Sequence, residues 1–252
     1  MDIPIRLEKP PLTQAVFELR IESCKQLLQL LPGILYQKFG KNIEAKELSV
    51  PIPAAMAEQL ELLNPQFKFQ PKKSVTKDDI VINFGENNII FVCEGDYPGW
   101  HAFSRTIKEI LEIIVDSFDS INIERYSMKT INMLSDQTGM VSSKLKLKIE
   151  ANGFNICDDN QFFSLRTDYK STNLVCVVNV ISHAAAKNSS MMTVKTGTLL
   201  DVDAICEPYT GSLSEFLSDF DGKAEVVHGE AKRRFFSLIS DEQLKKFGPI
   251  YV

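Results

Sequence analysis

The 252-residue chain has 44% hydrophobic and 24% charged residues, which is typical of a globular protein with a sizeable core. Its net charge of −5 gives no overall attraction to nucleic acid, and no apolar run approaches the ~20 residues of a membrane span. The charged, proline-interrupted start does not resemble a signal peptide, and five scattered cysteines predict reduced thiols, so we expect a cytoplasmic protein.

The first half of the chain begins with a predicted strand and a predicted helix. Alternation over residues 15–22 indicates a strand whose second face carries Glu18 and Arg20. We interpret this face as solvated, with pairing of the two charges to neighbours or to each other as the alternative. A leucine-rich helix follows at residues 24–39, with a break or kink expected at Pro32-Gly33. Further expected elements are strands at 43–50, 66–73, 79–84 and 89–94, a short helix at 54–63, and a hairpin turn at 85–88 with residues suited to positive φ.

The strongest helix of the first half is predicted over residues 100–118. Its apolar residues form a broad stripe and its charged residues take the opposite face. We therefore expect this helix to pack on a sheet.

The predicted elements of the second half repeat this order, although no repeat is visible residue by residue. Residues 121–134 predict a strand, and residues 142–150 fit a strand or a helix equally. A strand at 173–182 is apolar on both faces, as expected of a central strand. The other strands are expected at 161–170 and 192–206, with a bulge or bend at Gly197.

The C-terminal stretch predicts a helix pair that docks on a sheet. Apolar residues recur at steps of three and four across residues 222–238. Ser240 is expected to cap a short second helix, with Gln243 as its capping-box partner, and Gly248 and Pro249 to end it.

These elements together predict an α+β fold: a mostly antiparallel sheet, or sheets, with helices packed on one side. The order of elements is compatible with two fused βα(β)n-α halves. No linker rich in Gly, Pro or Ser separates them, so we expect residues 1–252 to form a single compact unit, with possible subdomains at 1–119 and 120–252.

Motifs for chemistry are mostly missing from the sequence. Nucleotide-binding glycine loops, the H-E-x-x-H zinc motif and the G-x-S-x-G nucleophile elbow do not occur. Asp201 and Asp203, at i and i+2 on a strand, face the same way and could share a divalent metal. Nucleotidyltransferases place such a pair after a Gly-Ser turn, whereas Gly211-Ser212 follows it here. The alternative is an acidic strand face near a sheet edge, and no catalytic residue or cofactor is assigned.

Two groups of residues are candidates for contacts with a partner. Tyr97 and His101 flank the only tryptophan, Trp100, which we expect in the core because it begins the apolar stripe. Lys232 and Arg233 give the terminal helix a basic side that could meet phosphate or an acidic partner. A solvated helix face is the alternative for the second group.

Three stretches resemble the motifs of one family and span nearly the whole chain. They are PPL at 10–12 with AVFELR at 15–20, YPGW at 97–100 followed by Phe103, and FFSL at 235–238 with SDE at 240–242. The chain thereby resembles a sporadically distributed, uncharacterised prokaryotic family with a PPL-x-x-AVFE-type start and an FFSL-x-[ST]-DE-type end. The resemblance implies no activity or catalytic residue. The scattered occurrence of that family implies a mobile, phage-defence or toxin–antitoxin context.

The leading hypothesis is a non-enzymatic protein that binds another macromolecule, with a protein as partner in an antitoxin-like or defence-associated accessory role. One alternative is an RNA-binding or RNA-processing module, because paired βαββ-type halves can present an open sheet to RNA. The other alternative is a metal-dependent nucleotidyl enzyme that uses Asp201 and Asp203.

Overall fold

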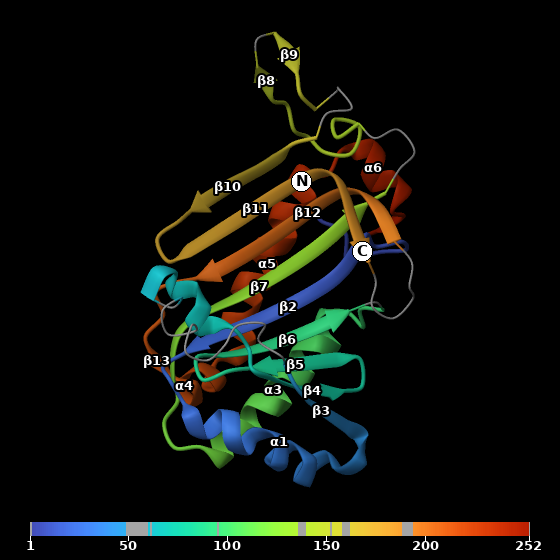
Figure 1. Cartoon of the computed structure of the whole chain (residues 1–252). Helices are drawn as coiled ribbons and strands as arrows, with labels where there is room; N and C mark the ends of the chain where they lie inside the picture. Colours follow the sequence, from blue (N-terminus) through green and yellow to red (C-terminus); the bar gives the residue numbers. More distant parts are fainter. Residues whose placement is uncertain are drawn as a thin grey trace. The chain divides into compact units, whose positions relative to one another are not determined.

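The computed structural model describes residues 2–48, 60, 62–94, 96–135, 140–151, 153–157, 162–187 and 194–251. The predicted α+β class is confirmed, with helices packed on a mostly antiparallel sheet (Figure 1). The chain forms two compact units that interleave along the sequence, and the division at 1–119 and 120–252 stays a prediction. Unit 1 comprises Met1–Ala15, Lys129–Ala204 and Val226–Val252, and unit 2 comprises Val16–Met128 and Ile205–Glu225.

Unit 1 is built on a sheet in the strand order β10-β11-β12-β7-β2. Strand β11 is flanked by strands on both sides but lies next to the edge strand β10, so it is interior and not central. Its neighbouring residues Val177 and Val178 are both buried although they point to opposite faces, as predicted. Gly197 lies where a Cβ would come within 2.5 Å of the carbonyl oxygen of Leu134, so close backbone approach requires glycine there. The bounds are β10 (Ser164–Lys170), β11 (Leu174–Lys187), β12 (Val194–Cys206), β7 (Asn122–Leu134) and β2 (Leu12–Ile21), the last three having residues in both units.

Helix α5 (Phe220–Leu238) and helix α6 (Asp241–Lys246) form the predicted C-terminal pair. The Ser240 hydroxyl accepts from the Gln243 N–H, which confirms the predicted cap. The reciprocal capping-box bond is not formed, because the Ser240 N–H donates to the Lys144 carbonyl at 2.9 Å instead. Gly248 adopts the left-handed conformation (φ 63°) after α6, as a helix stop requires. The apolar face of α5 is buried through Ala224, Val227, Ala231 and Phe235.

Short strands complete unit 1. Strand β1 (Arg6–Leu7) pairs with β14 (Pro249–Ile250), so backbone near the two ends of the chain is joined by hydrogen bonds. Strand β8 (Glu150–Ala151) pairs with β9 (Phe154–Asn155) in a hairpin. Residues 142–149, which fitted a strand or a helix equally, form neither and consist of turns and irregular backbone with one bridge from Leu145 to Ile239.

Unit 2 has the strand order β7-β2-β6-β5-β4-β3, with β3 to β6 antiparallel. The strand predicted at 66–73 is wrong: the 3-10 helix η2 (Pro65–Phe69) occupies its first half, with Asn64 capping the Gln66 N–H, and residues 70–72 are irregular. Positive φ is not found at 85–88, where Gly85 instead avoids a 2.9 Å contact with the Gln70 carbonyl oxygen. The bounds are β3 (Ile43–Glu47), β4 (Lys73–Lys77), β5 (Ile80–Phe84), β6 (Asn88–Glu94) and β13 (Gly211–Ser212).

The helices of unit 2 cover its core. Helix α1 (Lys25–Phe39) runs without a break through Pro32, because its buried Leu27, Leu31 and Leu35 outweigh the local cost of the proline. The break predicted there is therefore wrong, and the kink that was its alternative stays a prediction. The predicted amphipathic helix is confirmed as α3 (Trp100–Ser117). Within the described part of unit 2, helix α4 (Leu213–Ser218) and the 3-10 turn η1 (Gly40–Asn42) are further helical elements. The helix predicted at 54–63 lies largely outside the described residues.

Among the described residues, no helix combines the length and the apolar character needed to cross a membrane.

Candidate functional site

Asp201 and Asp203, the predicted metal ligands, lie on β12 in unit 1. Asp201 is buried, and its Oδ2 lies 2.9 Å from Lys129 Nζ and accepts from Asn179 Nδ2 at 3.3 Å. The lysine charge therefore already compensates this carboxylate. Asp203 is half-buried. Within the described ranges, no group of three His, Cys, Asp or Glu side chains has the geometry to hold a metal ion.

Tyr97 and His101 lie at the start of α3 in unit 2. His101 is exposed, as expected, but Tyr97 is half-buried and its hydroxyl is inaccessible and lacks a hydrogen-bond partner among the described residues. Burial raises the pKa of Tyr97, and its ring packs edge-on to Phe103 at 5.8 Å. Trp100 is half-buried, and its indole N–H donates to Glu225 Oε2 at 2.7 Å. Only His101 of this segment presents an accessible polar group.

The basic side of α5 is partly compensated within the helix. Arg233 is 62% exposed, and its Nη1 lies 2.6 Å from Glu230 Oε2. The same glutamate holds Arg234, whose guanidinium stacks on Tyr169 of β10 with 3.8 Å between Cζ and the ring centroid. Lys232 is half-buried. The half-buried Glu230 therefore reduces the positive charge that Arg233 can offer to an acidic partner.

Glu18 and Arg20 pair with each other and with a neighbouring strand, in a charged cluster on β2 and β7 of unit 2, as the alternative to a solvated face had it. Glu18 was interpreted as part of a solvated strand face, but its side chain is only 16% exposed and Arg125 is 12% exposed. Glu18 Oε2 accepts from Arg125 Nη2 at 3.1 Å, and its Oε1 lies 3.4 Å from Arg20 Nε. Phe69 of η2 covers Arg20, with the guanidinium carbon 4.0 Å from the ring centroid. The Glu-x-Arg spacing in the sequence was the signal for the Glu18–Arg20 pair. No residue near this pair in the sequence indicated that Phe69 would cover Arg20.

This cluster balances its own charges. Arg125 Nη1 also lies 3.7 Å from Glu207 Oε2, so two arginines face two glutamates. Because neither arginine is left with uncompensated charge, the geometry favours fixing η2 on the sheet over binding an anion. Two further contacts hold η2 on unit 2: Lys68 with Glu124 at 3.8 Å, and Asn88 Nδ2 with the Phe69 carbonyl.

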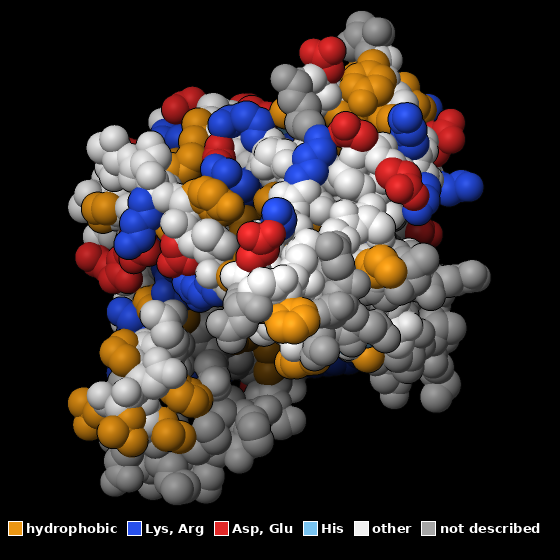
Figure 2. All heavy atoms as spheres, turned by 90° about the horizontal axis from the view of Figure 1, so that it is seen from above, with side chains coloured by type: hydrophobic (Ala, Val, Ile, Leu, Met, Phe, Trp, Pro, Cys, Tyr) orange, Lys and Arg blue, Asp and Glu red, His pale blue; other side chains and the backbone are white. Residues whose placement is uncertain are grey.

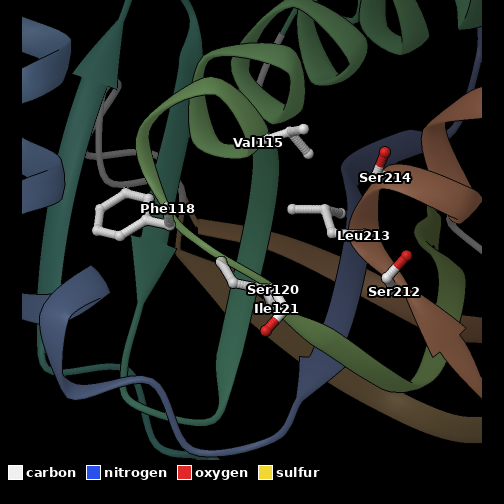
Figure 3. A pocket seen from close by; sticks show the side chains of 7 residues that line it. All are labelled: Val115, Phe118, Ser120, Ile121, Ser212, Leu213 and Ser214. Atoms are coloured by element: carbon white, nitrogen blue, oxygen red, sulfur yellow. The ribbon is translucent and has the colours of Figure 1, made fainter.

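A small hollow lies beside α3 and α4 in unit 2 (Figure 3). Its volume of about 180 Å³ is below the several hundred Å³ of usual ligand pockets. The Ser212 hydroxyl on its rim caps α4 by accepting from the Glu215 N–H. The hollow therefore does not suit an organic cofactor. Its lining residues are Val115, Phe118, Ser120, Ile121, Ser212, Leu213 and Ser214.

Large hydrophobic side chains are exposed on unit 1. Phe154, on the β8–β9 hairpin, is 67% exposed, and Phe162, just before β10, is 72% exposed. Met140 is also exposed and lies near the base of the hairpin, because the neighbouring Val141 N–H donates to the Cys157 carbonyl. Figure 2 shows acidic and basic side chains intermixed on the visible face, without a continuous area of either charge.

No family model matches the chain, and no curated protein matches it.

Proposed function

We propose that the chain is a non-enzymatic protein that binds another protein, and that the β8–β9 hairpin makes the central contact through Phe154. The observation that carries the proposal is a phenylalanine two-thirds exposed on a hairpin. Aromatic side chains are enriched in the buried cores of protein interfaces, where a single anchor supplies much of the affinity.

The geometry of the β8–β9 hairpin suits an element that offers a side chain to a partner. Among the described residues, β8 and β9 pair only with each other. Gly153 takes φ 79° in the turn, which permits a tight reversal directly before Phe154. A two-stranded ribbon gains little stability from itself in water, so an apolar side chain there has little structural purpose. Covering Phe154 with a partner's apolar pocket would remove that surface from water.

The charges of the chain suit a protein partner better than RNA. Exposed basic side chains lie beside acidic ones, as in Lys46 with Glu44 at 3.1 Å and Arg166 with Asp168 at 3.0 Å. Such pairs leave little positive field for phosphates. The scattered cysteines of the sequence support a place in the cytoplasm. The sequence resemblance alone supports a prokaryotic phage-defence or toxin–antitoxin context.

Tagged chains expressed at native level in the host would test the proposal. Wild type, Phe154→Ser and the control Leu30→Ser would be purified in parallel after nuclease treatment, and co-eluting proteins identified by mass spectrometry. Leu30 is a suitable control because it is 54% exposed on α1. We expect a partner that elutes with wild type and Leu30→Ser but is lost from Phe154→Ser. A partner protein that still elutes with Phe154→Ser would contradict the proposal. So would a parallel purification without nuclease in which RNA is the only molecule captured.

A further inference from the structure

The outer edge of β10 in unit 1 presents free backbone groups. Among the described residues β10 pairs only with β11, in a register that joins Ser164 to Ile181 and Lys170 to Val175. Two bonds fix the phase of this ladder: Ser182 N–H to the Phe163 carbonyl, and Ser171 N–H to the Leu174 carbonyl. Opposed residues alternate between bonded and non-bonded pairs in an antiparallel ladder. The odd-numbered residues of β10 therefore bond to β11, and the even-numbered ones point their N–H and C=O groups outward.

The sequence of β10, SLRTDYK, is self-complementary about its central Thr167. In an antiparallel pair of two copies related by a two-fold axis at this residue, Arg166 lies opposite Asp168 of the other copy, twice. Both residues are even-numbered, so their backbone groups are the free ones that would bond across the axis. Leu165 lies opposite Tyr169 of the other copy on the helix side, where non-bonded pairs bring side chains closest.

We infer that two copies of this chain associate through β10, which extends the sheet of unit 1 across a two-fold axis. The Arg166 guanidinium already meets Asp168 of its own strand, with Nε to Oδ1 at 3.0 Å and Nη2 to Oδ2 at 3.4 Å. Pairing of two copies places each arginine between two carboxylates. Moving the axis to residue 166 places Arg166 opposite Arg166 of the other copy, and moving it to residue 168 does the same for Asp168. Like charges directly opposite each other are unfavourable. The charges thus select this register.

The other edge strand, β3 in unit 2, is less suited to the same pairing. It has five residues, against seven in β10. The Leu48 N–H bonds to the Lys72 carbonyl, so Ile43, Ala45 and Glu47 carry the outward groups of β3. Pairing two copies about Ala45 would place Ile43 opposite Glu47, an apolar side chain against a charge. Strand β10 contains no such mismatch, and no proline, glycine or bulge that would protect its edge.

Charge reversal tests the register directly. The full chain would be studied by sedimentation velocity over a concentration series, as wild type, Arg166→Asp, Asp168→Arg, the double swap Arg166→Asp/Asp168→Arg, and an equimolar mixture of the two single variants. Lys46→Glu on β3 is the control for the other edge. We expect wild type, the double swap and Lys46→Glu to reach twice the 28.4 kDa chain mass. Each single reversal, which sets four like charges together, should weaken association roughly tenfold or more.

The mixture distinguishes this interface from any other. One single variant carries two acids and the other two bases, so the mixture should form heterodimers although neither variant dimerises alone. A monomeric wild type at every concentration would overturn the inference. So would dimers that survive both single reversals, a mixture that stays monomeric, or loss of the dimer in Lys46→Glu alone.

Discussion

Arg125 Nη2 lies 3.1 Å from Glu18 Oε2, and the two side chains, on neighbouring strands β7 and β2, are both largely withdrawn from water. Glu18 also lies 3.4 Å from Arg20, so one carboxylate contacts two guanidinium groups. Its removal takes this partner from Arg20 and leaves Arg125 facing the more distant and more exposed Glu207 at 3.7 Å, which is why the cluster should matter for stability.

Glu18→Gln should therefore lower the free energy of unfolding by about 1–3 kcal/mol. The matched control is Glu44→Gln, which breaks the 3.1 Å pair with Lys46 on the exposed strand β3 and should change stability by less than about 1 kcal/mol. Urea unfolding at neutral pH measures both. Equal effects of the two changes would show that the Glu18 cluster is as hydrated as a surface pair.

Phe235→Ala should cost about 3–5 kcal/mol, because it empties a buried site on α5 where the ring packs edge-on to Phe236 at 5.1 Å. Arg233→Gln on the same helix should cost less than about 1 kcal/mol, since this side chain is exposed. Thermal melting of the two variants decides the matter. A Phe235→Ala variant that melts like wild type would contradict the packing of α5.

Two glycine-to-alanine substitutions should change the free energy of unfolding in opposite directions. Gly197→Ala should destabilise by about 1–3 kcal/mol, because its Cβ would collide with the Leu134 carbonyl oxygen. Gly33→Ala should stabilise by about 0.5–1 kcal/mol, because Gly33 lies in α1 with open space around the missing Cβ. Denaturant unfolding measures both. A neutral Gly197→Ala variant would show that β12 does not approach Leu134 so closely.

Glu215 should make stability pH-dependent. Hydrogen bonds from the Ser212 backbone and hydroxyl lower the pKa of this carboxyl. A group with a depressed folded-state pKa contributes stability that is present above its unfolded pKa and lost as pH falls through the folded one. Glu215→Gln should thus be less stable than wild type at neutral pH, and the difference should shrink in acid. Unfolding midpoints across this pH range measure the effect.

The same pKa can be followed residue by residue. Ser212→Ala should raise the pKa of Glu215 part of the way toward its ordinary range in an NMR titration, because it removes the hydroxyl donor and keeps the backbone N–H donor. Ser214→Ala, two residues further along α4, is the control and should leave that pKa unchanged. Identical titrations of the two variants would refute the role of the cap.

Local sequence patterns determined the elements whose cause is local. The stripe of α3, the two apolar faces of β11 and the stop at Gly248 were all predicted, because helix period, strand period and backbone conformation depend on residues near one another. The antiparallel α+β class followed from the order of these elements.

Tertiary structure alone decided which polar residues meet. The sequence placed Glu18 and Arg20 on one strand face, but Arg125 and Phe69 reach them from more than 40 residues away along the chain. In the same way Lys129 compensates Asp201, and Lys144 takes the Ser240 N–H that the capping box would have used. Helix α1 also continues through Pro32, because burial of the helix's leucines outweighs the local cost of a proline inside a helix. Charge compensation and burial depend on distances in space, which spacing along a sequence does not encode.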